Sequence, residues 1–351
     1  MKRERSALLL PEWPSTDRSL WLTANSQGGF LEPDGKAVHW REATRKEVFK
    51  RYGLWLGFLS SAGLLNAASR PTDRVTEASL KGYLLWLEAR GNASTTISTT
   101  IRNLREALRV MEPDADITLL DDLTKTLKVR EVPVRDKHAR VVHVDTLLTG
   151  ALAFLDEVPE RSYFSRLHQA GKYRDGLVVA FLSCRPVRLS NVTSMCLGKH
   201  MLRSNDGWYC RFEAEEMKDN LSLDFPFPKR LEPYLETYLD EYRPLLLRGR
   251  ETPDIWISAR GTPMSKQSVY CNTCSLTEEL YGKHVNPHLF RDCAATTFAT
   301  EDPEHILAIG RILGHASINT SIRHYNQSQM IAAADVYHQV MSDLESDGGW
   351  S

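Results

Sequence analysis

The chain has 351 residues and a net charge of −1, and 42% of its residues are hydrophobic and 25% are charged. This is the composition of a globular protein of two domains, with no apolar run near the roughly 18 residues that a membrane span needs. Six scattered cysteines, and an N-terminal apolar run too short for a signal peptide, exclude a disulfide-rich secreted protein and predict a cytoplasmic one.

The first forty residues contain Trp, Pro and Gly without a sustained hydrophobic period, which predicts an irregular N-terminal extension over residues 1–40. Residues 41–140 contain 18 Lys and Arg against 13 Asp and Glu, a net charge of +5. Residues 141–351 have a net charge of −6. A basic region beside an acidic one is compatible with DNA contact through local patches.

Residues 41–128 predict an all-helical domain of about four helices. Apolar residues recur at helical spacing from Glu42 to about Ala62. A second helix opens at Thr76, with Ser79 three residues later, and a shorter fourth helix spans Leu119 to Leu127. The apolar stripe of the third helix consists of Ile97, Ile101, Leu104 and Leu108.

The third helix also carries arginines at the spacing of its apolar stripe, one residue out of phase with it. They are Arg102, Arg105 and Arg109, and the hydroxyl residues of the first turns include Thr95, Thr96, Ser98 and Thr99. Hydroxyls, helix N-terminal amides and arginines are the groups that hold DNA phosphates, so we treat these seven as candidate DNA-binding residues. A charged face in contact with solvent alone is the alternative interpretation.

Residues 129–141 are charged, contain Pro133 and lack a helical stripe, which predicts a linker between domains. The pattern over residues 142–341 is mixed, and residues 342–351 predict an acidic tail ending in glycine-rich sequence. The chain is therefore expected to contain two domains joined by this linker, with an extension at each end.

The second domain opens with helices and continues with two alternating segments, Trp208 to Phe212 and Leu221 to Phe227, which predict a β-hairpin. Its remainder is mainly helical. The predicted fold class is mainly α with a small antiparallel sheet, an α+β protein. Cys271 and Cys274 have metal-ligand spacing, but a structural zinc site needs four ligands, so we interpret them as a helical pair and expect no metal.

The most informative residues stand near the C-terminus, in the order His288, Arg291, His315 and Tyr325. The segment from Pro303 to Leu313 predicts a helix that ends at a glycine, which presents His315 just past a helix end. His-x-x-Arg, then Leu-Gly-His, then Tyr resembles the C-terminal signature of the tyrosine recombinase (phage integrase) family. Histidine occupies position 324, so the tyrosine of the motif is Tyr325.

The resemblance implies two further site residues upstream. The family's first arginine is followed by a small polar residue two positions later and an aliphatic residue four positions later, a pattern that Arg188 satisfies and Arg185 does not. The family's acid three positions after the arginine is Asn191 in this chain. The family's hairpin lysine corresponds to Lys218, which lies between the two alternating segments.

The implied chemistry is phosphoryl transfer through a 3′-phosphotyrosine intermediate, with Tyr325 as the nucleophile. Arg188 and Arg291 would bind the non-bridging oxygens, helped by His288 and His315. Lys218 would protonate the departing 5′ oxygen. No metal and no nucleotide cofactor are required, because arginines supply the positive charge and the ester conserves the bond energy.

The resemblance further implies a helical core-binding domain at residues 41–128 and a catalytic domain at residues 142–341, which together clamp a double-stranded DNA recombination site. Four protomers would assemble on two duplexes from monomers or dimers. A C-terminal helix at residues 328–341 would dock either on a neighbouring protomer or on its own domain.

Three other functions remain open at this point. A type IB topoisomerase-like enzyme would use similar chemistry to relax DNA without a specific site. A catalytically silent DNA-binding accessory protein would keep the fold and lose the reaction. A metalloenzyme built from His288, His315 and cysteines is disfavoured by the arginine-rich site and the lack of four zinc ligands.

Overall fold

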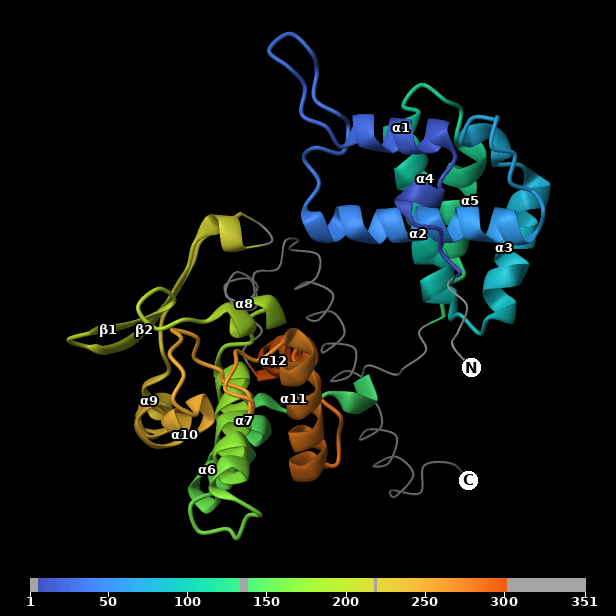
Figure 1. Cartoon of the computed structure of the whole chain (residues 1–351). Helices are drawn as coiled ribbons and strands as arrows, with labels where there is room; N and C mark the ends of the chain where they lie inside the picture. Colours follow the sequence, from blue (N-terminus) through green and yellow to red (C-terminus); the bar gives the residue numbers. More distant parts are fainter. Residues whose placement is uncertain (1–5, 133–137, 218–219, 302–351) are drawn as a thin grey trace, which may run out of the picture. The chain divides into compact units, whose positions relative to one another are not determined.

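The computed structural model describes residues 6–132, 138–217 and 220–301. These form two compact units, one made of the described residues up to 132 and the other of those from 138 onward (Figure 1). Each unit has its own hydrophobic core. The fold class is mainly α with a small antiparallel sheet, as the sequence predicts. None of the helices within the described residues is long and apolar enough to cross a membrane.

The N-terminal unit is an all-helical bundle. Its helices are α1 (Ser15–Ala24), α2 (Glu42–Ser61), α3 (Glu77–Ala89), α4 (Ser94–Met111) and α5 (Thr118–Val129). Helix α4 contacts the other four, and the core between them contains the fully buried Tyr52, Trp55 and Tyr83. Thr76 caps α3 by accepting a hydrogen bond from the Ser79 amide, which explains why α3 begins where the sequence predicts. Helices α2 to α5 all lie where hydrophobic periodicity places them.

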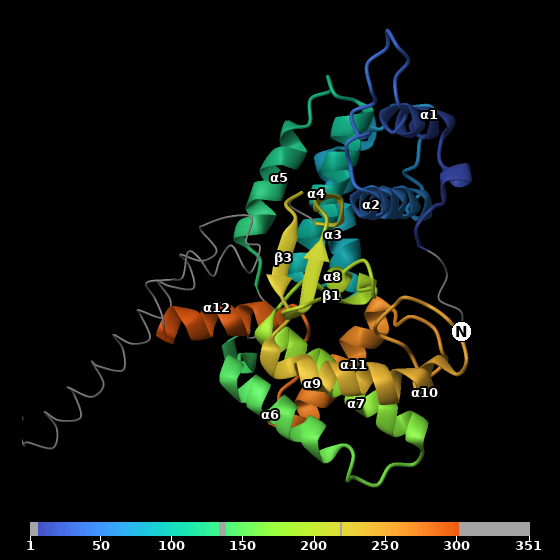
Figure 2. The same ribbon diagram turned by 90° about the vertical axis from the view of Figure 1, so that its left-hand side faces the viewer.

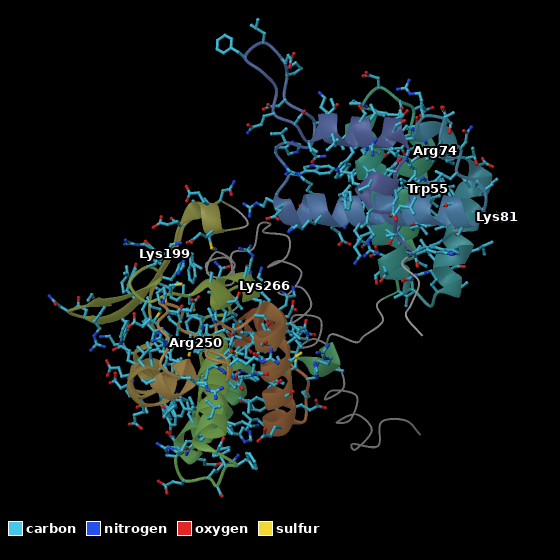
Figure 3. All side chains as sticks on the ribbon, in the orientation of Figure 1. Trp55, Arg74, Lys81, Lys199, Arg250 and Lys266 are labelled. Atoms are coloured by element: carbon cyan, nitrogen blue, oxygen red, sulfur yellow. The ribbon has the colours of Figure 1, made fainter. Side chains whose placement is uncertain are left out.

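The expectation of an irregular segment over residues 1–40 is wrong for residues 15–24, which form α1. Trp13 and Trp21 are buried in the core of the N-terminal unit, and Asp17 is buried as well. Asp17 binds Arg74, labelled in Figure 3, through two hydrogen bonds of 2.6 and 2.9 Å. A helix anchored by aromatic rings and one buried ion pair has no apolar period, so periodicity could not reveal it.

The C-terminal unit is built around α7 (Arg166–Cys184), whose residues 176–183 are all buried. The other α-helices in the described part of this unit are α6 (Val144–Glu157), α8 (Leu189–Ser194), α9 (Glu232–Thr237), α10 (Arg243–Leu247), α11 (Lys266–Tyr281) and α12 (Leu289–Glu301). Helices α6, α10 and α11 contact α7. A π-helical turn, Tyr238–Tyr242, joins α9 to α10, so that the three form one continuous rod (Figure 2).

The sheet of this unit is antiparallel in the order β1 (Met201–Ser204), β2 (Gly207–Phe212) and β3 (Leu223–Pro226). Cys210 on the central strand is paired with Met201 on one side and with Phe225 on the other. The predicted hairpin corresponds to β2 and β3, which confirms it. Strand β1 was not expected, because its sequence, two apolar residues followed by two polar ones, lacks the alternation typical of a strand.

Candidate active site

The first candidate residue, Arg188, lies at a junction between two helices. Helix α7 ends at Cys184, and Arg188 is the N-terminal capping residue of α8, with φ −64° and ψ 146°. Val187 and Val192 are buried on either side of it, whereas Arg188 itself is half-buried. The two valines therefore hold the junction in the core and place the arginine at its edge.

Arg291 is brought to the same junction from a distant part of the sequence. It lies in the first turn of α12, is 8% exposed, and donates a hydrogen bond from Nη1 to the carbonyl oxygen of Pro186 at 2.9 Å. Pro186 is two residues before Arg188, so this bond joins the two arginine motifs that are separated by about a hundred residues in the chain. A buried guanidinium needs such an acceptor, because leaving it unpaired would cost several kcal/mol, of order 3–5.

His288 precedes α12 and is exposed. The side chain of Asn286 accepts hydrogen bonds from the amides of His288 and Leu289, both at 3.0 Å. This side chain supplies an acceptor to two amides that precede the first helical hydrogen bonds. Asn286 therefore determines where α12 begins, and so where both His288 and Arg291 are presented.

Arg185, the alternative to Arg188, has a different environment. Its Nη1 donates to the Cys184 carbonyl at 3.0 Å, and its guanidinium lies 5.6 Å from the centre of the Phe225 ring on β3. Arg185 is thus engaged by a backbone carbonyl and by an aromatic ring of its own unit. The arrangement supports the choice of Arg188, which remains a prediction.

The segment between β2 and β3 contains Lys218, and side chains from other elements bind the two residues that come directly before this lysine. Asn191 of α8 donates from Nδ2 to the Met217 sulfur at 2.9 Å, and both side chains are buried. Glu216 binds His200 and Lys199. The hydrogen bond from Lys199, followed by that from His200, lowers the pKa of Glu216 to about 2, so this carboxylate is ionised at neutral pH.

The structure therefore joins the segment around Arg188 to Arg291 through Pro186, and to Met217, the residue that precedes Lys218, through Asn191. Lys218 itself, His315, Tyr325 and the predicted helix at residues 328–341 lie outside the described residues. Their roles rest on the sequence motif. The contacts of Asn191 with Met217 and of His200 with Glu216 were not expected, since no residue spacing in the sequence links these pairs.

The candidate DNA-binding residues share helix α4 but not the same exposure. Arg102 and Arg109 are exposed and Arg105 is half-buried. Arg105 and Arg109 form ion pairs with Asp121 of α5, at 3.5 and 3.6 Å, and also with Glu106. Thr95, Thr96 and Thr99 are partly exposed. Ser98 is only 4% exposed, so its inclusion on a DNA-contacting surface is wrong. Helix α5 packs beside α4 and places Asp121 next to Arg105 and Arg109.

The cysteine pair lies on α11, with Cys271 exposed and Cys274 buried, as a helical pair predicts. Burial raises the pKa of Cys274 to about 11, which keeps its thiol protonated at neutral pH. Within the described part of the chain, no three or more His, Cys, Asp or Glu side chains are grouped so that they could hold a metal ion.

The chain is similar in sequence to proteins named tyrosine recombinase XerD. It is 24% identical to that of Staphylococcus saprophyticus over 273 residues, which cover 76% of this chain and 84% of the relative. It is also 24% identical to that of Staphylococcus aureus over 270 residues, which cover 76% and 83%. No family model matches the chain.

Two solved structures share its fold. One is the XerH site-specific recombinase bound to a palindromic difH substrate in a post-cleavage complex, with a TM-score of 0.57, 15% identity, and coverage of 92% of this chain and 95% of that chain. The other is the Tn1549 transposon integrase in complex with transposon right end DNA, with a TM-score of 0.52, 15% identity, and coverage of 91% and 98%.

Proposed function

We propose that the chain is a tyrosine recombinase, a site-specific DNA recombinase that cleaves and rejoins DNA through a 3′-phosphotyrosine intermediate on Tyr325. One observation supports this proposal most directly. The hydrogen bond from Arg291 to the Pro186 carbonyl joins the two segments that carry the proposed phosphate-binding arginines. Two guanidinium groups on adjoining segments can neutralise one phosphate.

In the proposed reaction the Tyr325 oxygen attacks the scissile phosphorus while its hydroxyl proton passes to water, and the bond to the 5′ oxygen breaks. Lys218 donates a proton to that oxygen, so a 5′ hydroxyl leaves and the 3′ phosphate remains esterified to the enzyme. The reverse attack by a 5′ hydroxyl of the partner strand restores the phosphodiester and frees Tyr325. No net bond energy is lost, which is why no nucleotide is consumed.

The arginines and histidines act on the phosphate oxygens. Arg188 and Arg291 stabilise the charge of the pentacoordinate transition state, and His288 and His315 add hydrogen-bond donors. The guanidinium of Arg291 has five N–H donors in one plane, so the bond that holds Nη1 on Pro186 also orients the rest of the group. Losing one such preorganised donor costs about 2.7–4 kcal/mol of transition-state stabilisation in comparable sites.

The partner in this proposal is a double-stranded DNA recombination site, gripped by the helical unit as a core-binding domain and by the C-terminal unit as the catalytic domain. Four protomers would assemble on two duplexes, from monomers or dimers in the absence of DNA. The reaction would take place in the cytoplasm. The related structures are complexes with recombination-site or transposon-end DNA, which supports DNA as the partner. The six free thiols support the cytoplasmic location.

The proposal is tested on the nucleophile. Tyr325→Phe keeps the aromatic ring but removes the attacking oxygen, so the variant should bind DNA normally and form no covalent adduct. DNA ends that remain attached to the wild-type protein after denaturation are first mapped by sequencing. A labelled, nicked suicide substrate made from the mapped site is then run with each protein on a denaturing gel.

Tyr281→Phe is the matched control. The Tyr281 hydroxyl donates to the Leu147 carbonyl at 2.7 Å, which is a structural contact, so this variant should keep the covalent band. A covalent band from Tyr325→Phe would overturn the nucleophile assignment. If no DNA end remains attached to the wild-type protein after denaturation, the proposed function itself is wrong.

A further inference from the structure

The turn that precedes Lys218 is attached to the rest of the C-terminal unit at two consecutive residues. Strand β2 is followed by a short 3₁₀ turn, Ala214–Glu216, and then by Met217. The side chain of Glu216 is bound by His200, and that of Met217 by Asn191. On the other side of Lys218, the Asn220 amide donates to the Met217 carbonyl at 3.3 Å, so a backbone hydrogen bond joins the residues before and after positions 218–219.

His200 has a defined proton arrangement. Its ring is 2% exposed and stacked on Phe212, with ring centres 5.3 Å apart. The Cys196 amide donates to Nδ1 at 3.1 Å, which makes Nδ1 the acceptor and leaves the ring proton on Nε2. Nε2 therefore donates to the Glu216 carboxylate, whose two oxygens lie at 3.1 and 3.2 Å. A buried ring held from two sides is a rigid anchor for this carboxylate.

Lys199 also binds Glu216, but its side chain is mostly exposed (Figure 3). An exposed ion pair between flexible side chains contributes little to geometry. The buried contact with His200 is therefore the one that determines where Glu216 lies.

Asn191 supplies the second anchor from α8, the helix whose N-terminal capping residue is Arg188. It is 3% exposed, lies three residues after Arg188, and donates to the Met217 sulfur at 2.9 Å. The same short helix thus carries the proposed phosphate-binding arginine and a contact to the residue adjacent to Lys218. Asn191 occupies the position where the family's acid is expected, and its amide can donate to sulfur where a carboxylate could not.

We infer that His200 and Asn191 are positioning residues for Lys218, which hold Glu216 and Met217 so that the lysine reaches the 5′ oxygen of a phosphate bound by Arg188. The inference rests on the proposed function, because it takes Lys218 as the general acid. Neither residue touches the substrate. Both act through the two residues that come directly before the lysine.

Geometry explains why two anchors matter. Proton transfer requires the donor within about 2.6–3.2 Å of the leaving oxygen, and a misplacement of about 1 Å can slow a reaction by about 100-fold. A lysine side chain is long and flexible, so the position of its own backbone decides which volume the ammonium group samples. Loosening the preceding two residues should therefore impair acid catalysis while leaving nucleophilic attack intact.

The test compares two substrates under single-turnover conditions. One is the ordinary suicide substrate, and the other carries a 5′-thio leaving group, which departs with little need for protonation. Glu216→Ala and Asn191→Ala should cleave the ordinary substrate about 10- to 100-fold more slowly than the wild type, and the thio substrate at nearly the wild-type rate. Lys218→Ala should show the same pattern with a larger deficit. Glu216→Gln, which keeps an acceptor for His200, should restore most of the rate.

Glu215→Ala is the matched control, because Glu215 is an exposed carboxylate in the same turn and should leave both rates unchanged. If Glu216→Ala and Asn191→Ala are slowed equally on both substrates while Lys218→Ala is rescued by sulfur, the positioning inference is wrong and the acid assignment stands. If sulfur does not rescue Lys218→Ala, the acid assignment fails and the inference fails with it. Covalent product from the wild type still supports the proposed function in both cases.

Discussion

Asp17 is a buried carboxylate on which three segments of the N-terminal unit converge. Arg74 binds both of its oxygens, and the Tyr52 hydroxyl donates to one of them. Burial and the adjacent Asp17 raise the pKa of Tyr52 well above its usual value, so this hydroxyl stays protonated and remains a donor. The cluster ties α1 and α2 to the segment before α3.

Removing the cation from this cluster should be costly. Arg74→Ala leaves the Asp17 carboxylate buried without its partner, which should lower the free energy of unfolding of the N-terminal unit by about 3–5 kcal/mol. Urea unfolding followed by tryptophan fluorescence measures the change. Lys46→Ala is the control, because its ion pair with Glu42 is exposed, and its unfolding midpoint should not move. Equal midpoints for both variants would contradict the role of the buried pair.

At the scale of elements, the pairing of α4 with α5 divides the arginine face. Asp121 of α5 lies 3.5 Å from Arg105 and 3.6 Å from Arg109, although Arg109 is exposed, as Arg102 is. A phosphate that approaches Arg105 or Arg109 must compete with this carboxylate. The three arginines should therefore contribute unequally to DNA binding.

We expect Arg102→Ala to weaken DNA binding and to lower the slope of log K against log salt by about 0.9, the value for one phosphate contact. Arg105→Ala and Arg109→Ala should change the slope less, and Asp121→Asn should strengthen binding by releasing both arginines. Fluorescence anisotropy titrations at several salt concentrations measure the slopes. Lys125→Ala, which removes an exposed cation of α5, is the control. An unchanged slope after neutralising all three arginines would refute the contact.

At the scale of the whole molecule, different parts of the chain are expected to attract DNA and to mediate assembly. The segment at residues 41–140 is basic and residues 141–351 are acidic, so electrostatic attraction to DNA is expected mainly from the N-terminal unit. The sequence after Tyr325 has an apolar stripe followed by an acidic tail, which is typical of a helix that docks on another surface.

Truncation after Gln327 should therefore leave DNA binding by monomers and reduce assembled synapses. Native gels with labelled recombination-site DNA separate the monomer complex from higher-order complexes, and the full-length chain is the reference. Normal higher-order complexes from the truncated protein would show that residues 328–351 are not required for contacts between protomers.

Much of the architecture could be predicted because its signals are local. Helices α2 to α5 follow from apolar residues at helical spacing, the start of α3 from the Thr76 cap, and the β2–β3 hairpin from alternation. The candidate site was also predicted as a set, because the order of His288, Arg291, His315 and Tyr325 is readable along the chain.

The tertiary structure alone decided which polar side chains contact one another across different elements. The bond from Arg291 to Pro186, the Asn191 contact with Met217, and the pairing of Arg105 with Asp121 each join residues that share no periodicity or motif. Helix α1 also depends on tertiary contacts, because its buried Asp17 binds Arg74 and Tyr52, which are distant in the sequence. Local patterns determine which face of an element is apolar, whereas the partners of its polar groups depend on how elements pack, and that packing minimises the energy of the whole unit.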